Sequence, residues 1–190
     1  SGDGANGTIN TVNLTILGDT NVIEAVWGAS ISSGSMVTTT NILMAGGTVN
    51  EKGYTTDVQG NQTIPGGFST VVGGSRSGNV GTTNVEVTGD AVVFAVQGGG
   101  REPGTNTTTA NVTISGKATV QHMVCGSLTD GNDQYSDPPV GESFVEVKDS
   151  ANVKDVYGGG WDLWTNPLYP STGKTNVVIS GGHISGSVYG

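Results

Sequence analysis

Basic residues are scarce in this chain of 190 residues. Only seven residues are Lys or Arg against 16 Asp and Glu, which gives a formal net charge of −9. A phosphate backbone is bound by clustered basic side chains, and the sequence contains no such cluster. Nucleic acid is therefore not an expected partner, and the acidity favours solubility with at most some affinity for cations.

Cysteine, aromatic residues and long apolar runs are also scarce. Cys125 is the single cysteine, which excludes an internal disulfide. Charged residues make up 12% of the chain and aromatic residues 6%. No apolar run is long enough to span a bilayer and no segment has the pattern of a signal peptide. We therefore expect no membrane insertion by this segment.

Glycine, threonine, asparagine and valine are abundant instead. The chain has 33 glycines, more than twice the usual share. These residue types are poor helix formers. Threonine and valine favour strands, whereas glycine and asparagine favour turns. The composition predicts an all-β protein.

One sequence unit recurs along the whole chain. Its pattern is Thr-Asn-Val-x-Val-x-Gly, a polar residue, two or three apolar positions and a glycine cluster. Successive copies start at unequal intervals because the connections vary in length, which is typical of a β-helix. A left-handed β-helix would have a strict hexapeptide period, which is absent. The sequence predicts a single domain, 1–190, folded as a right-handed parallel β-helix of about six irregular coils. The copies cover 12–29, 40–75 with an insertion, 83–100, 110–127, 143–160 and 175–190.

Alternation within each copy predicts which side chains enter the coil. In Asn84-Val85-Glu86-Val87, the two valines share one face and Glu86 lies on the other. The equivalent apolar pairs should stack as aliphatic columns, with outward positions such as Thr15 and Thr113 in solvent; Leu43 and Val178 are apolar exceptions. The equivalent pairs are Leu14/Ile16, Ile42/Met44, Val112/Ile114, Val145/Val147 and Val177/Ile179.

Asparagine occupies one repeat position in all copies but one, where Phe144 stands. Identical amides at strand spacing can form a hydrogen-bonded ladder. The column could serve as a polar binding strip or as a ladder that holds a turn. We favour the ladder at a turn, because turns are where asparagine is common. The column consists of Asn13, Asn41, Asn84, Asn111 and Asn176.

The glycine clusters are predicted to turn a corner of the coil. The stretch 156–160, Val-Tyr-Gly-Gly-Gly, matches 96–100, and the glycines should have positive φ. Cys125 stands in place of a glycine in this corner, which indicates a structural thiol. A phosphate site is not expected, because no strand–loop–helix context and no lysine follows the run. The residue before each cluster should share one stacking column: Trp27, Gln97, Val124, Tyr157 and Tyr189.

Two connections, 128–142 and 161–174, combine aromatic and acidic residues. Both should leave the same corner of adjacent coils and so be neighbours. Aromatic faces stack on pyranose rings and acids bind hydroxyls, so these connections could bind carbohydrate; alternatively, the tryptophans shield the side of the coil. The candidate ligand-binding residues are Trp161, Asp162, Trp164, Tyr169 and Tyr135.

Metal binding and catalysis have little support in the sequence. Asp130, Asn132 and Asp133 superficially resemble a calcium loop but lack the EF-hand spacing and its terminal Glu, so no cofactor is expected beyond a weak calcium site. The basic residues are scattered and no repeated strand position is rich in acids, so no catalytic residues are predicted; a polysaccharide lyase or hydrolase is the least favoured alternative. The threonine runs 38–40 and 107–109 are expected in connections, which argues against the flat threonine lattice that ice binding needs.

The motif V-x-x-V-Y-G-G-G and the stretch GGHISGSVYG, 181–190, resemble the long β-helical, adhesin-like surface proteins of gut bacteria. The resemblance covers nearly the whole chain. It implies a secreted or cell-surface rod that acts in adhesion or display, with a glycan or a surface protein as a partner and no catalytic residues. The last copy stops one glycine into its triplet, so we expect a monomeric segment of a longer chain.

Overall fold

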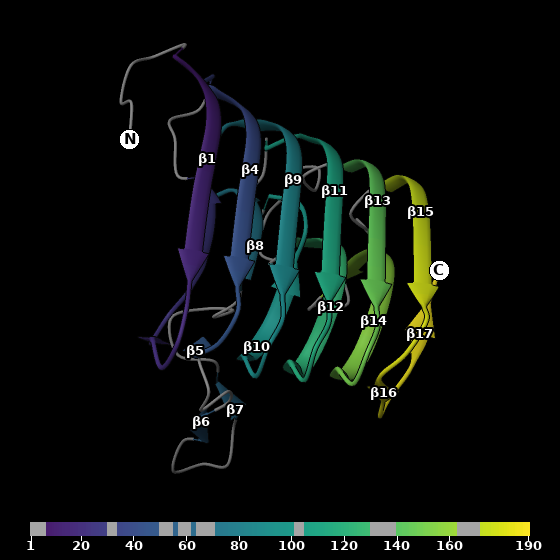
Figure 1. The fold of residues 1–190 in the computed structure, drawn as a ribbon. Helices are drawn as coiled ribbons and strands as arrows, with labels where there is room; N and C mark the ends of the chain where they lie inside the picture. Colours follow the sequence, from purple (N-terminus) through teal and green to yellow (C-terminus); the bar gives the residue numbers. More distant parts are fainter. Residues whose placement is uncertain are drawn as a thin grey trace.

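The computed structural model describes residues 7–29, 34–49, 55–56, 62–63, 71–100, 105–129, 140–162 and 172–190. In these ranges the chain is all-β, and its strands stack in parallel to form a β-helix (Figure 1). In Figure 1 the strands of the front sheet all point downward, and the chain returns upward behind them. Each following strand lies to the right of the one before it, so the winding is right-handed. The part of the chain that the structure describes has no helix of the length and apolarity that a membrane span requires.

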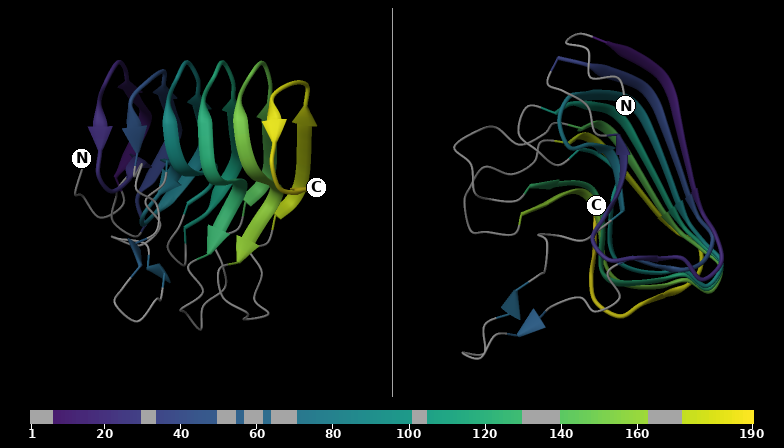
Figure 2. Two further views of the ribbon diagram at one scale, coloured as in Figure 1. Left: turned by 90° about the horizontal axis from the view of Figure 1, so that it is seen from below. Right: turned by 90° about the vertical axis from the view of Figure 1, so that its left-hand side faces the viewer.

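A six-stranded parallel sheet forms the long side of the coil, and β1 and β15 are its two edges (Figure 2). Each repeat copy contributes one of its strands. The pairing keeps the repeat positions aligned, so that Asn41 of β4 pairs with Asn13 on one side and Asn84 on the other. The strands, in spatial order, are β1 Thr8–Ile16, β4 Met36–Met44, β9 Asn79–Val87, β11 Thr107–Ile114, β13 Val140–Val147 and β15 Thr172–Ile179.

A nine-stranded sheet forms the remaining sides of the coil. The second copy, 40–75, is split there as the sequence predicts: β5 and β8 belong to one copy, and the small antiparallel pair β6–β7 lies in the insertion between them (Figure 1). The strands of the nine-stranded sheet are β2 Asn21–Val22, β3 Val26–Ala29, β5 Thr48–Val49, β8 Val71–Ser75, β10 Val92–Gln97, β12 Thr119–Thr129, β14 Asn152–Asp162, β16 His183–Ile184 and β17 Val188–Tyr189. The hairpin strands are β6 Thr55–Thr56 and β7 Gln62–Thr63.

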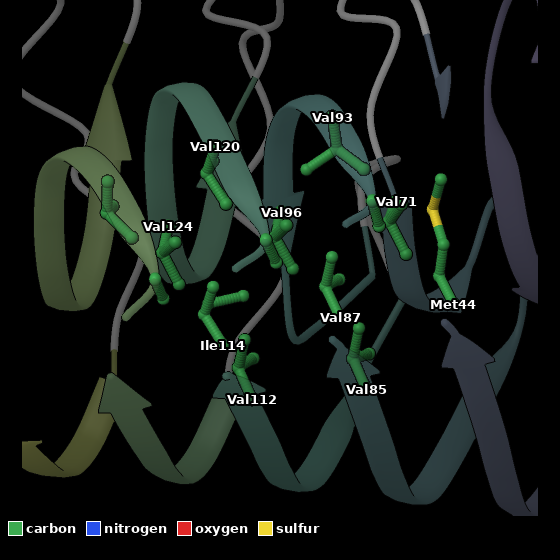
Figure 3. Close-up of a cluster of buried hydrophobic side chains, with 14 of the residues drawn as sticks. Met44, Val71, Val85, Val87, Val93, Val96, Val112, Ile114, Val120 and Val124 are labelled. Atoms are coloured by element: carbon green, nitrogen blue, oxygen red, sulfur yellow. The ribbon is translucent and has the colours of Figure 1, made fainter. Parts of the chain in front are cut away.

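The predicted aliphatic columns form the core. Val85 pairs with Val112 and Val87 with Ile114, and all four side chains are buried. Side chains from the two sheets point toward one another inside the coil (Figure 3). At roughly 25 cal/mol per Å² of buried apolar surface, this burial is the main force that closes the coil.

The glycine clusters lie where the two sheets approach closely, and the prediction of positive φ for them is wrong. None of the glycines 98–100 and 158–160, all of which the structure describes, has a positive φ. An added Cβ at Gly126 would lie 2.5 Å from the carbonyl oxygen of Gly158 and 2.7 Å from Cβ of Ser143. Gly126 therefore needs to be glycine because there is no room for a side chain, and the same holds for Gly98, Gly100 and Gly158.

Inward hydroxyls of the six-stranded sheet bind the carbonyls of this glycine column. The Thr40 hydroxyl donates to the oxygen of Gly73 at 2.6 Å, and the Thr83 hydroxyl to that of Gly98 at 2.8 Å. The hydrogen bonds are buried, where a carbonyl without a partner would be costly. This contact links the two sheets in successive copies.

Left-handed backbone occurs at a different turn, directly after the strands of the six-stranded sheet. Gly18, Gly89 and Gly116 have φ of 63°, 66° and 64° there. Asp149, with φ 60°, takes the same place in the next copy, and its carboxylate accepts a hydrogen bond from the amide of Gly116 at 3.1 Å. Glycine and Asp are residues that tolerate this conformation.

The stacking column of the second sheet differs from the prediction by one residue. Cys125, not Val124, pairs with Gln97 and Tyr157. The register shifts because β12 has one more residue than its neighbours between the positions of Val120 and Met123, a bulge that sequence alignment of the copies does not reveal. Val124 therefore lies in the buried valine column. The expected aromatic stacking occurs between Tyr157 and Tyr189, whose ring centroids are 4.9 Å apart at an interplanar angle of 9°.

Replacing Gly126 by alanine tests the close approach of the two sheets. We expect the free energy of unfolding to fall by about 1–3 kcal/mol, since the new methyl group overlaps backbone and Ser143. Gly159→Ala is the matched control, because its Cβ would make only ordinary contacts of 3.6 Å or more. Urea denaturation of both variants measures the difference, and equal stabilities would contradict the assignment.

Candidate functional site

A ladder of side-chain amides crosses the outer face of the six-stranded sheet. Nδ2 of Asn41 donates to Oδ1 of Asn13 at 2.8 Å, Asn84 donates to Asn41 at 2.8 Å, and Asn111 donates to Asn84 at 2.9 Å. The predicted ladder is thus present in four strands, but its predicted location in a turn is wrong. These asparagines lie within β1, β4, β9 and β11, at outward positions, and each is followed by an inward aliphatic residue.

The ladder ends where Phe144 takes the asparagine position in β13. Phe144 pairs with Asn111 on one side and Asn176 on the other, so no amide bridges the two. Asn176 instead donates to Oε1 of Glu142 and to the carbonyl oxygen of Ser143, both at 3.3 Å. Asn176 shares the row predicted for it without joining the ladder.

A shallow groove runs beside this row of residues and crosses all six strands. Its larger hollow, of about 330 Å³, lies over β1, β4, β9 and β11. A second hollow, of about 300 Å³, continues over β11, β13 and β15, and the two share Asn111 and Thr113. One wall is the asparagine row with Phe144 in it; the opposite wall is the next outward row, namely Thr15, Leu43, Glu86, Thr113, Glu146 and Val178.

The charges of the groove are acidic. Glu86 and Glu146 are the charged residues that line it. Glu146 is paired with Lys148, whose Nζ lies 2.9 Å from Oε2, and this hydrogen bond raises the pKa of Lys148. The charge of Glu146 is therefore balanced by Lys148, whereas Glu86 has no such ion pair among the described residues.

An ion pair borders the groove beside Phe144. Nζ of Lys174 lies 2.5 Å from Oε1 of Glu142, and the hydrogen bond from Lys174 lowers the pKa of that carboxyl. The same ammonium lies 5.9 Å from the ring centroid of Phe144, within cation–π range. Phe144 is 38% exposed, so a large part of its ring faces solvent.

A row of threonines runs parallel to the ladder on its other side. Thr11, Thr39, Thr82 and Thr109 pair in register across β1, β4, β9 and β11. The prediction that the threonine runs 38–40 and 107–109 lie in connections is therefore wrong. Both runs fall inside strands, because β4 and β11 begin before the recognisable repeat pattern does.

The two connections proposed as a sugar-binding surface do start from neighbouring strands. Leu128 of β12 pairs with Trp161 of β14, and Thr129 pairs with Asp162. They also return side by side, because Glu142 pairs with Lys174. Trp161 and Asp162 end β14. Of the other candidates, Trp164, Tyr169 and Tyr135 lie outside the described residues.

The candidate calcium residues Asp130, Asn132 and Asp133 also lie outside the described residues. Within the described ranges, no group of three or more His, Cys, Asp or Glu side chains is arranged to hold a metal ion.

The thiol and the histidine of β12 are buried, whereas His183 of β16 is exposed. Cys125 is fully buried, which raises the pKa of its thiol far above the ordinary value, so it is not a thiolate nucleophile. His122, at the bulge in β12, is 9% exposed and stacks on Phe94 with ring centroids 5.1 Å apart. Burial, followed by the charge of Lys154, lowers the pKa of His122, and Asp155 opposes this shift in part.

Sequence reasoning missed the groove because it treated the outward positions only as solvated. The missed residues include Leu43, Glu86, Thr113, Phe144 and Glu146. Their outward direction was predictable from alternation, and two unexpected apolar residues at such positions, Leu43 and Val178, were the available signal.

Comparisons with family models, with curated proteins and with solved structures gave no significant match to this chain.

Asn84 is expected to contribute to stability through its two ladder bonds. Asn84→Leu should lower the free energy of unfolding by about 1–3 kcal/mol relative to Asn152→Leu, which removes an exposed asparagine of the other sheet. Asn13→Leu removes a single ladder bond at the end of the row and should cost about half as much. Chemical denaturation measures the three values, and identical losses at positions 84 and 152 would contradict a stabilising ladder.

His122 should make stability depend on pH below its ordinary pKa. Because its pKa is lowered in the folded protein, neutral His122 contributes stability that is complete above pH 6.5 and is lost as the pH falls toward the folded pKa. The melting temperature should therefore decline below pH 6.5, before Glu142 protonates. His122→Gln should flatten this part of the profile, and an unchanged slope would show that His122 is not responsible.

Proposed function

We propose that this chain is a non-catalytic module of a bacterial cell-surface protein of the adhesin-like kind, secreted or attached to the cell surface. It acts in adhesion or as a rigid spacer. The observation that carries this proposal is the unbroken register of six parallel strands. A solenoid in which each copy pairs with the next over its full strand length is an extended, stiff body.

The side-chain chemistry of the outer face supports a binding rather than a catalytic role. Two of the acids on this face, Glu142 and Glu146, are each paired with a lysine. The hydroxyl and amide groups near these two acids lie at regular positions of the repeat. Glycoside hydrolysis needs two carboxyl groups with different protonation states at a fixed separation. The buried thiol of Cys125 and buried His122 are unsuited to nucleophilic catalysis on an external substrate.

A second candidate is carbohydrate binding by the connections 128–142 and 161–174. The pairing of Leu128 with Trp161, and of Glu142 with Lys174, favours it, because both connections start and end side by side. Aromatic and acidic residues from two segments would then form one surface. This candidate places the ligand on the two connections, which lead into the starts of β13 and β15, and not in the groove.

The proposal predicts adhesion without turnover. Beads coated with the protein should be retained on surfaces that carry polysaccharide or mucin, while prolonged incubation with the same polysaccharides releases no reducing ends and no unsaturated products. Heat-denatured protein on beads is the control for passive retention.

Released sugar would overturn the non-catalytic assignment. Absence of retention would leave the spacer role alone. If retention disappears in Trp161→Ala and Trp164→Ala while their melting temperatures stay unchanged, the two connections are the binding surface.

A further inference from the structure

The amides of the ladder keep unused hydrogen-bonding capacity. A carboxamide has two N–H donors and an oxygen with two lone pairs. In the ladder, Asn41 and Asn84 each donate one hydrogen bond and accept one, and they have no further partner among the described residues. One donor and one acceptor per amide therefore remain, repeated at the strand spacing of about 4.8 Å.

The opposite wall of the groove carries hydroxyl, apolar and carboxylate groups. Thr15 and Thr113 present hydroxyls, and Leu43, half-buried, lies with Glu86 between them. Beyond the ladder, Phe144 and Val178 are 38% and 52% exposed. A groove of this kind can hold a ring that is apolar on its faces and carries hydroxyls around its edge, as a pyranose does.

Charge selects among polymers of this shape. Glu86 and Glu146 line the groove, no lysine or arginine among the described residues lines either hollow, and the whole chain carries a formal net charge of −9. An anionic polymer would be repelled. Lys148, the nearest cation beside Glu146, is already paired with it.

An extended peptide fits this surface less well than a glycan does. Peptides that bind sheets add a strand at a free edge, where backbone donors and acceptors are unpaired. The groove lies over the face of the sheet, and the backbone of β4, β9, β11 and β13 is paired on both sides. Only side chains are offered to a ligand here.

We propose that the groove between the asparagine row and the row from Thr15 to Val178 binds a linear, neutral, hydroxyl-rich glycan. The glycan lies along the stacking direction of the β-helix and crosses the strands. Hydroxyls both donate and accept, so each can satisfy the free donor and acceptor of an amide, and Phe144 packs against a sugar face beyond Asn111. This inference rests on the adhesive arm of the proposed function, to which it adds a site and a ligand class.

The repeating amides predict the character of binding. Because Asn13, Asn41, Asn84 and Asn111 are equivalent and evenly spaced, a polymer gains several weak contacts at once and can shift by one strand without losing them. Affinity should rise with chain length, and short oligosaccharides should bind weakly.

Affinity electrophoresis tests the proposal with defined polymers. The probes are neutral mixed-linkage β-glucan, glucomannan, xylan, mannan and dextran, with polygalacturonate and alginate as anionic counterparts. The wild type should be retarded by at least one neutral polymer and by neither anionic one. Failure of every neutral polymer to retard it overturns the inference and leaves the spacer role intact.

Variants assign the binding to the groove. Asn84→Leu combined with Asn111→Leu should weaken affinity about tenfold or more, because the amide contacts to the ligand are lost. Asn152→Leu, an exposed asparagine of the other sheet, should leave affinity unchanged. Thr113→Val keeps the ladder intact and should weaken binding by a smaller factor, so an effect there is not explained by damage to the ladder.

The outcomes separate this inference from the proposed function. Full affinity in both the double variant and Thr113→Val overturns the groove assignment while adhesion through another surface remains possible. Retardation that depends on the asparagines, accompanied by cleavage of the polymer, supports the groove and overturns the non-catalytic assignment.

Discussion

The in-register parallel pairing of each repeat copy with the next is the constraint on which the rest of this protein depends. Over the six-stranded sheet, backbone hydrogen bonds place equivalent positions side by side. Every side chain therefore meets its own counterpart from the neighbouring copy. A slip of one residue would exchange the inner and outer faces, so that the valines would face solvent and the amides would enter the core.

The narrow interior explains the composition that the chain has. Where the two sheets come closest, Gly126 faces Ser143 with no space for another methyl group. Hydroxyls such as that of Thr83 satisfy the carbonyls that this approach buries. Glycine, threonine, serine and valine are the residues that meet these two demands, and they are the residues that dominate the sequence.

The outer face of the same sheet is subject to a weaker constraint. Within the described ranges no other element packs on it, yet asparagine recurs there in register and its amides bond to one another. Groups held on strands are positioned more precisely than groups on connections of varying length. This is why the outer face, together with the exposed ring of Phe144, presents side chains in a better-defined arrangement than its shallow depth would suggest.

The sequence by itself determined the fold class, the repeat boundaries, the aliphatic columns and the existence of an asparagine ladder. These features follow from the period of two in a strand and from the recurrence of one pattern, both of which are local. Even the split second copy was predictable, because β8 resumes the pattern that the insertion after β5 interrupts.

The tertiary structure decided the features that depend on contacts between segments remote in sequence. The glycine clusters are needed for close packing and not for positive φ, and only the opposite sheet reveals this. The bulge in β12 moved Cys125 into the column assigned to Val124, since an extra residue is recognised only against its paired strand. The groove, too, exists only between rows of side chains from six strands, so no single copy of the repeat contains it.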